Sequence, residues 1–309
     1  MRIGRGNLEL LLVTVIWGVN SIGVKDALGV FLPLQFNVVR LMLSAALLLA
    51  VMASSGKMEY PAKKERLPVL IAGFLSNTLY QLAFIKGIAM STASNTSFVL
   101  ATMPATTAVL SHLTGRQRMT SRMSVGVLMT VVGVLLVSAV GSGALSTSSD
   151  VLRGDLITLI GTLGFCIGTI YAADLTKTMS PIAYTTWTMV TGAFLMIPFS
   201  ISELRAANWG DVGVRHWGEL VFSGTFALVL SYILWNKGVK ESGPAKTAIF
   251  GNLTPVWTGL FGRLILKEGW TPAKFLGAAV ILGGVTLVRF GGAPAPGDAA
   301  DSRRKGIQT

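Results

Sequence analysis

Polar and aromatic side chains that interrupt long apolar runs are the residues of this sequence best suited to chemistry. A polar group costs free energy within hydrocarbon, so such residues usually face a protein interior or a water-filled cavity. Together they offer the hydrogen-bonding groups and aromatic walls that a small-molecule site needs. The candidate substrate-binding residues are Trp17, Asn20, Arg40, Asn77, Tyr80, Gln81, Tyr232, Trp235 and Asn252.

Arg40 is the charged member of this set and lies in an apolar run that begins at Pro33. Its guanidinium stays protonated and needs acceptors. Either it binds a substrate carboxylate, or it snorkels to the interface or clamps backbone carbonyls between helices. Asn20, one turn after Trp17, either lines a site or links helices for about 1 kcal/mol. Lys25, at the end of the same run, is expected to reach the membrane interface.

Two polar and aromatic faces are predicted in equivalent parts of the chain. The first consists of residues spaced three or four apart, which share a helix face: Asn77, Tyr80, Gln81 and Phe84. The second contains Tyr232 and Trp235. Such a pair of faces suits a cavity at the membrane midplane. Trp235 also fits an interfacial aromatic belt next to Lys237.

Two prolines are candidates for bending points. Pro104 and Pro255 lie within apolar runs, where proline removes a backbone hydrogen bond and kinks a helix. They are predicted gating positions, although a static kink explains them equally well. Asn252, three residues before Pro255, is expected to line the cavity.

The elements that must position these residues are membrane-spanning helices. Hydrophobic residues make up 51% of the 309 residues and charged residues only 13%, which excludes an ordinary soluble domain. Runs of about 20 apolar residues recur, the length of one helical crossing. The sequence predicts an all-α integral membrane protein whose ten transmembrane helices span residues 8-25, 33-54, 67-86, 92-112, 121-140, 154-174, 181-203, 217-236, 244-265 and 272-290.

Positive charge favours cytoplasmic termini. The net charge of +12 is spread between apolar runs and forms no single basic patch, so no nucleic-acid partner is expected. Seventeen of the 26 Lys and Arg residues fall on the side of the termini and eight on the other. Because Lys and Arg are retained in cytoplasmic loops, we expect a multi-pass protein of the bacterial inner membrane with both termini in the cytoplasm.

The chain repeats itself. At an offset of 151 residues, Pro104 aligns with Pro255, and at an offset of 148 Asp26 aligns with Asp174. The predicted units are a first five-helix repeat (1-145), a second (146-291) and a disordered basic cytoplasmic tail (292-309). An odd number of crossings in each repeat inverts the second one, which is the basis of alternating access.

Several function classes lack a signature. The histidines, His112 and His216, form no metal-ligand set, and no paired acids or nucleophile-base spacing is visible. We therefore expect no metal, no cofactor and no enzyme. The expected partners are the lipid bilayer and a small-molecule substrate. The sequence does not decide whether the protein forms a homodimer.

The sequence resembles the EamA family of the drug/metabolite transporter superfamily over roughly residues 7 to 290. The resemblance rests on an opening Trp17-Gly18-x-Asn20 with Lys25, Pro33 and Arg40, on Pro104 and Pro255, on Thr120 and Thr271, and on Gly126, Gly133, Gly277 and Gly284. The family has a Glu after the fourth helix of each repeat. Glu268 matches that position in the second repeat, and Gln117 replaces it in the first.

This resemblance implies ten helices in inverted repeats and export of amino acids or related small polar metabolites. Uptake or exchange of nucleotides, cofactors or cationic drugs is the alternative. A third interpretation lies outside transport, namely that the protein is a membrane sensor or a membrane enzyme.

Overall fold

The computed structural model describes residues 5–54, 56, 58–115, 119–136, 148–267, 269 and 271–291. In those ranges every regular element is a helix and no β-strand occurs, which confirms the all-α fold class there. The α-helices are α1 (Arg5–Ala27), α2 (Pro33–Ser54), α3 (Arg66–Gly73), α4 (Tyr80–Met90), α5 (Ala93–Leu100), α6 (Met103–Leu113), α7 (Ser121–Leu135), α8 (Ser148–Leu175), α9 (Pro181–Ala206), α10 (Val214–Phe222), α11 (Ser231–Ser242), α12 (Pro244–Phe250), α13 (Thr254–Ile265) and α14 (Pro272–Gly291). Short 3-10 or π segments are η1 (Lys63–Glu65), η2 (Phe74–Leu79), η4 (Trp209–Asp211), η5 (Ser223–Leu230) and η6 (Gly251–Leu253). Gln117, Glu268 and the tail 292–309 lie outside the described residues.

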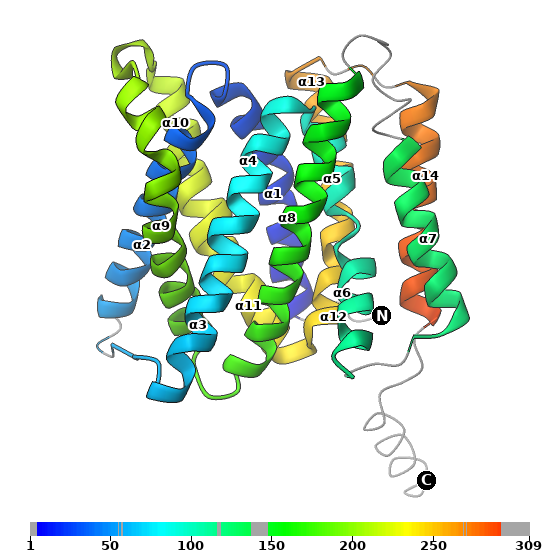
Figure 1. The fold of residues 1–309 in the computed structure, drawn as a ribbon, viewed down its shortest axis with the longest axis horizontal. Coiled ribbons are helices and arrows are strands. Elements are labelled where there is room, and N and C mark those ends of the chain that lie inside the picture. The colour runs from blue at the N-terminus through cyan, green and yellow to red at the C-terminus, as the bar shows by residue number, and fades with distance from the viewer. Residues whose placement is uncertain are drawn as a thin grey trace, which may run out of the picture.

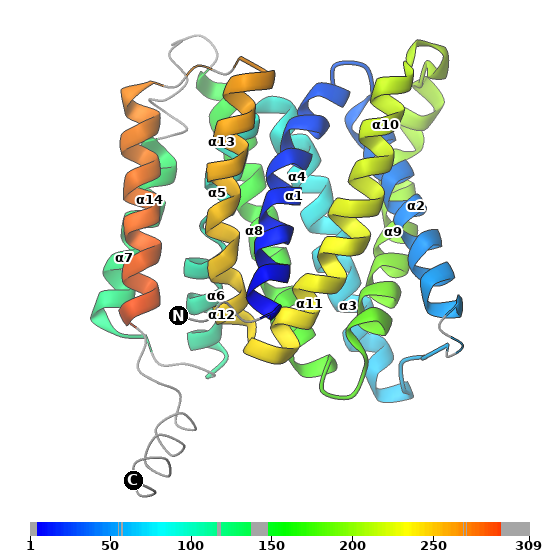
Figure 2. The same ribbon diagram turned by 180° about the vertical axis from the view of Figure 1, so that it is seen from behind.

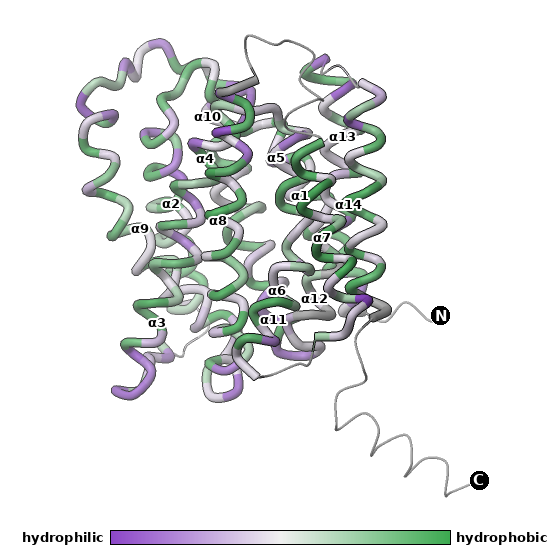
Figure 3. Tube along the Cα trace, turned by 45° about the vertical axis from the view of Figure 1, so that its right-hand side comes forward, coloured by the Kyte–Doolittle hydropathy of each residue, from purple (hydrophilic) through white to green (hydrophobic). Residues whose placement is uncertain are grey.

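Six helical segments among the described residues are long and apolar enough to cross a membrane. They are Gly6–Ala27, Pro33–Ser54, Lys63–Met90, Asp150–Leu175, Pro181–Ala206 and Val214–Ser242. Shorter or interrupted helices lie at the other four predicted positions, so the crossing number of ten stays a prediction. Apolar residues follow the helices, and strongly polar ones gather toward the two ends of the bundle (Figure 3).

The bundle has two ends, at which the helices are connected (Figure 1). The N-terminal end holds the start of α1 and residues 176–180, which join α8 to α9. The α10 end holds residues 28–32, which join α1 to α2, together with the start of α10. These two names are used below.

Both predicted proline positions mark a break in a helix. Pro104 lies in the first turn of α6, just after α5 ends at Leu100. Pro255 lies in the first turn of α13, directly after the 3-10 segment η6. Proline lacks a backbone N–H and its ring clashes with the preceding turn, so the helix breaks ahead of it. The predicted bending points exist, and their role in gating stays a prediction.

Helices that align with one another in the predicted repeats pack in antiparallel pairs. In the α7–α14 pair, Gly126 contacts Gly284 while Gly133 contacts Gly277, so the order of contacts is reversed (Figures 1 and 2). A Cβ atom on Gly126 would lie 2.4 Å from the carbonyl oxygen of Gly284, so the backbones approach as closely as glycine permits.

The α2–α9 pair shows the same reversal. The backbone N–H of Gln35, near the start of α2, donates to Glu203 near the end of α9. Two residues further along α2, the Asn37 side chain contacts Met196, which lies seven residues before Glu203 in α9. Both pairs therefore combine one helix from each half of the chain in opposite directions.

The largest buried apolar cluster joins α1 to α4 with α8 to α11, and the candidate site lies inside it. The α7–α14 pair stands at one edge of the molecule, where smaller apolar clusters attach it to α5 and α6 (Figures 1 and 2). The site is therefore built by the main cluster, and the edge pair contributes packing.

Candidate substrate cavity

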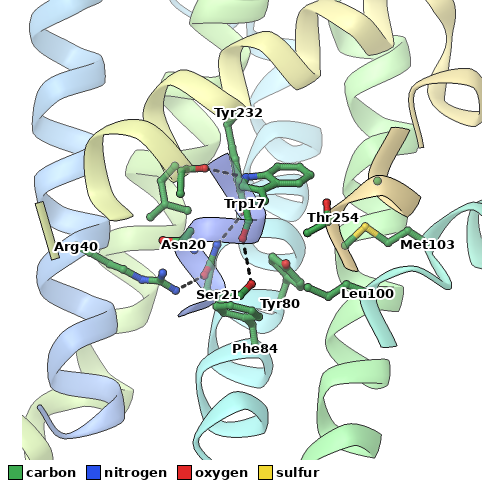
Figure 4. A pocket seen from close by; sticks show the side chains of 14 residues that line it. Trp17, Asn20, Ser21, Arg40, Tyr80, Phe84, Leu100, Met103, Tyr232 and Thr254 are labelled. Carbon is green, nitrogen blue, oxygen red and sulfur yellow. Dashed lines mark hydrogen bonds between the residues drawn. The ribbon is translucent and has the colours of Figure 1, made fainter. Parts of the chain in front are cut away.

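A cavity in the middle of the bundle has about 530 Å³ of space that no protein atom fills, including space open to solvent (Figure 4). Six of the nine predicted binding residues line it: Trp17, Asn20, Arg40, Tyr80, Gln81 and Tyr232. Further lining residues include Ser21, Phe84, Leu100, Met103 and Thr254, which the prediction did not count as binding residues. Helices of both repeats thus supply one site.

Arg40 is fixed inside this cavity by side chains. It is 1% exposed, so it does not snorkel. Its Nε and Nη2 atoms donate to Asn37 Oδ1 at 3.0 and 2.9 Å. Nη1 donates to Ser223 Oγ at 2.8 Å, and Nη2 donates to Gln81 Oε1 at 2.7 Å. These acceptors are side chains, so Arg40 is not a clamp on backbone carbonyls.

All of these acceptors are neutral. No carboxylate among the described residues lies within salt-bridge distance of Arg40. The rings of Phe36 and Phe84 lie 5.3 and 5.6 Å from its guanidinium carbon, which gives cation–π attraction without neutralising the charge. A buried cation normally has an anionic partner, so the cavity is suited to a ligand that supplies one.

Gln81 connects Arg40 to Tyr232. Its Oε1 accepts from Arg40, while its Nε2 donates to the Tyr232 hydroxyl at 2.8 Å. Gln81 and Tyr232 are 151 residues apart, which is the predicted repeat offset, so positions that align in the predicted repeats meet here. The chain of hydrogen bonds therefore runs from the cation to the contact between the repeats.

Four aromatic rings, called the aromatic wall below, pack together between the central cavity and its neighbour: Trp17, Phe165, Tyr232 and Trp235. The Trp17 and Trp235 rings are 5.0 Å apart, and Trp17 Nε1 donates to the Ala227 carbonyl at 3.0 Å. Trp235 is 3% exposed and packs within this wall. Its interpretation as an interfacial belt residue is wrong, because a belt residue would reach the membrane surface.

Asn77 and Trp235 belong to a second, smaller cavity of about 280 Å³. Tyr232 lines both cavities, so the two adjoin at that residue. Asn77 Oδ1 and Trp235 Nε1 are buried and have no hydrogen-bond partner in the described part of the chain. Asn252 is not among the residues that line either cavity.

The shared face predicted for the third span is divided by a π segment. Tyr80, Gln81 and Phe84 line the central cavity, but Asn77 lies within η2 and lines the smaller one. A π turn takes more residues than an α turn, so the α-helical spacing used in the sequence analysis fails across it. The equivalent η5 interrupts the second repeat in the same way.

Two partners of Arg40 were not predicted. Asn37 precedes Arg40 by three residues on α2, a spacing that places them on one helix face and could have identified it. Ser223 lies 183 residues away, and no local pattern in the sequence points to it.

Lys25 has hydrogen-bond partners that the sequence did not predict. Its Nζ donates to the carbonyls of Ile88 and Ala89, at the end of α4, at 2.8 and 3.1 Å. The amine therefore satisfies carbonyls that the last turn of a helix leaves unpaired, in addition to any contact with the interface.

Comparison with known proteins identifies the family. Residues 4–139 and 152–290 each match the EamA-like transporter family. The chain is 28% identical to the uncharacterized transporter YyaM of Bacillus subtilis over 84% of this chain and 86% of that protein. It is 23% identical to the chloroplastic WAT1-related protein At3g02690 of Arabidopsis thaliana over 89% of this chain and 67% of that protein. A solved crystal structure with 14% identity covers 91% of this chain and 95% of its own, with a TM-score of 0.68, and shares the fold. The chain therefore belongs to the EamA-like transporter family of the drug/metabolite transporter superfamily and is a multi-pass membrane transporter.

Proposed function

We propose that this transporter exports amino acids or related small polar metabolites across the bacterial inner membrane. The observation that carries the proposal is Arg40, a buried cation with neutral partners that lines the central cavity. A substrate carboxylate would supply the missing negative charge and form charge-assisted hydrogen bonds with the guanidinium. The same positive charge disfavours cationic drugs as ligands of this cavity.

The remaining walls suit an amphipathic substrate. Aromatic rings of Trp17, Tyr80 and Phe84 supply apolar surface, while Asn20 and Ser21 supply polar groups. Small-molecule sites commonly combine a mainly apolar lining with a few fixed polar groups. An amino acid with an apolar side chain fits this combination better than a purely polar solute.

Alternating access is the proposed mechanism. Antiparallel packing of α7 with α14 and of α2 with α9 supports inverted repeats. The family model matches the chain twice, once in each half, which supports a duplication. Two inverted halves of similar shape can exchange conformations and so open a shared site to either side. Pro104 and Pro255 are the proposed bending points. The bias of Lys and Arg supports cytoplasmic termini.

The test is efflux from liposomes that contain the purified protein. Each vesicle batch is loaded with one labelled compound. Every amino acid is compared with the amine that lacks only its carboxylate, as 3-methylbutylamine does for leucine. At least one amino acid should leave faster than from protein-free vesicles, and its amine should not. If no amino acid in a broad panel leaves faster than the control, the proposal is wrong.

A further inference from the structure

The central cavity contains one buried positive charge and no negative one. Among the described residues that line it, Arg40 is the single charged side chain and none is acidic. Its hydrogen bonds to Asn37, Ser223 and Gln81 use four of the five N–H groups of the guanidinium. One N–H on Nη1 therefore has no acceptor in the described part of the chain. An anionic acceptor would satisfy the charge and this N–H together.

An amide without a hydrogen-bond partner lines the same cavity. Asn20, on α1, is 7% exposed, and its Oδ1 is buried with no partner among the residues that the structure describes. In Figure 4 Asn20 lies on the side of the cavity where Arg40 lies. The other unpartnered oxygen of the lining, Thr254 Oγ1, is also neutral. Because a buried polar group without a partner is unfavourable, a ligand group that hydrogen-bonds to Asn20 is favoured.

Two acids near the cavity are out of reach of a group bound beside Arg40. Asp26 and Glu219 line a cavity that adjoins the central one at Asn20. Both already pair with Arg215, whose Nη2 lies 2.7 Å from Asp26 Oδ2 and whose Nε lies 3.3 Å from Glu219 Oε1. Asp26 also follows Asn20 by six residues on α1, a rise of about 9 Å along the helix. A cationic group next to a carboxylate on Arg40 therefore meets no acid.

The same two acids correct one expectation from the sequence. His216 stands beside Asp26 and Glu219, and one ligand atom from each of the three residues lies within 4.8 Å of the others. The expectation that His216 joins no metal-ligand set is therefore revised to a cluster of three. Because Arg215 lies 2.7 Å from Asp26, it would compete with a metal ion for that carboxylate.

Charge balance distinguishes two classes of carboxylic acid as ligands of the central cavity. At neutral pH an α-amino acid carries an ionised carboxylate and a protonated amine. Its carboxylate would pair with Arg40, but its ammonium group would become a second buried cation without an anionic partner. A 2-hydroxy acid with the same carbon skeleton is a monoanion, so its pairing with Arg40 leaves no unpaired charge. Since burial of an unpaired charge costs far more than burial of a hydrogen-bonded neutral group, the monoanion is favoured.

A hydroxyl group also suits Asn20 better than an ammonium group does. The amide of Asn20 offers both an acceptor and donors, and a hydroxyl can donate and accept, whereas an ammonium group can only donate. We propose that the central cavity prefers 2-hydroxy carboxylates to the corresponding α-amino acids, with the carboxylate on Arg40 and the hydroxyl on Asn20. This inference rests on the proposed binding of a substrate carboxylate by Arg40 and names the class of related metabolite.

Aromatic rings are the competing partners for an ammonium group. Trp17, Tyr80 and Phe84 line the cavity, and the faces of such rings attract cations. Phe84 already serves Arg40, whose guanidinium carbon lies 5.6 Å from the ring centre. Cation–π attraction also leaves the positive charge in place, so the hydroxy acid stays the preferred ligand. Tighter binding of the amino acid is the opposite outcome of the test.

The experiment measures dissociation constants by thermal-shift titration of the purified full-length protein. The three probes share one carbon skeleton and differ only at the α-carbon. Leucine has an ammonium group there, 2-hydroxy-4-methylpentanoate a hydroxyl group and 4-methylpentanoate only hydrogen. Asn20→Leu removes the amide at a similar side-chain size. Asn208→Leu is the control, because it makes the same change at an exposed residue that does not line the cavity.

The hydroxy acid should bind the wild type and Asn208→Leu about 10-fold more tightly than leucine or 4-methylpentanoate does. In Asn20→Leu its advantage over 4-methylpentanoate should disappear, while 4-methylpentanoate still binds. Leucine binding as tight as that of the hydroxy acid would overturn the inference. An undiminished advantage of the hydroxy acid in Asn20→Leu, or no shift with any of the three acids, would do the same. The three probes decide the preference on the wild type even if Asn20→Leu does not fold.

The results separate this inference from the proposed function. If the hydroxy acid binds as expected but no amino acid leaves the liposomes, the proposed export of amino acids fails and the preference stands. If an amino acid is exported and leucine is the tightest ligand of the three, the export stands and the preference fails.

Discussion

Arg40 depends on its shape as well as its charge. Its planar fork reaches Asn37, Ser223 and Gln81 at once, and a lysine amine is a point charge that cannot reproduce this geometry. Hydrogen bonds to a charged group contribute about 1.5–3 kcal/mol each. We predict that Arg40→Lys lowers kcat/KM for a transported amino acid about 10- to 100-fold, and that Arg40→Gln lowers it further.

The measurement is efflux from vesicles at matched protein content. Arg153→Lys is the control, because Arg153 is exposed and pairs with Asp150 at the surface. Wild-type rates in both Arg40 variants would mean that the guanidinium has no part in substrate recognition.

The Tyr232 hydroxyl should matter for stability. Tyr232→Phe keeps the ring in the aromatic wall but leaves the Gln81 amide N–H buried without its acceptor. Loss of one partner of a buried hydrogen bond costs about 1–3 kcal/mol. We predict a melting temperature at least about 2 °C lower in detergent. Tyr60→Phe, at a side chain that is exposed, should leave it unchanged. Equal melting temperatures for all three proteins would show that the hydroxyl contributes nothing.

At the level of elements, local sequence patterns predicted the positions of the helices better than the type of helical turn within them. Apolar runs located the helices, and proline chemistry located the breaks at Pro104 and Pro255. The π segment η2 was not visible, because nothing in its composition separates a π turn from an α turn. Asn77 therefore lines the smaller cavity and not the central one that Tyr80 and Gln81 line. The sequence alone could not place Trp235, because a tryptophan near a lysine fits either a membrane interface or an aromatic wall. Its burial in the structure distinguishes the two.

The α7–α14 pair offers a direct test of helix packing. A Cβ atom on Gly284 would lie 2.5 Å from the carbonyl oxygen of Gly126 and 2.9 Å from the backbone nitrogen of Thr130. Neither backbone atom can move without separating the helices, so Gly284→Ala should destabilise by about 1–3 kcal/mol and lower the melting temperature.

The neighbouring glycine is the matched control. Gly283→Ala would meet only the flexible Met129 Cε, at 3.4 Å, and should be tolerated. The same loss of stability in both variants would mean that helix propensity or another general effect, and not the close approach of α7 to α14, governs this pair.

At the scale of the whole molecule, the proposed mechanism requires the two ends of the bundle to face different compartments. Helix α8 connects them. Its start lies at the α10 end and its last residues at the N-terminal end (Figure 1). Arg153 and Lys177 are exposed near these two ends, with side chains that are 70% and 72% accessible. The single cysteine of the sequence, Cys166, is 1% exposed between them and should not react.

Single cysteines at these positions should therefore react from opposite sides of the membrane. Each cysteine is introduced alone into a Cys166→Ala protein in sealed right-side-out vesicles. A membrane-impermeant maleimide should label Arg153→Cys in these vesicles at once. Lys177→Cys should be labelled only after the vesicles are opened, because cytoplasmic termini place the N-terminal end inside. Labelling in the reverse order would mean that the termini are outside. If both cysteines react in sealed vesicles, α8 does not cross the membrane, and a substrate path between two compartments cannot run through the central cavity.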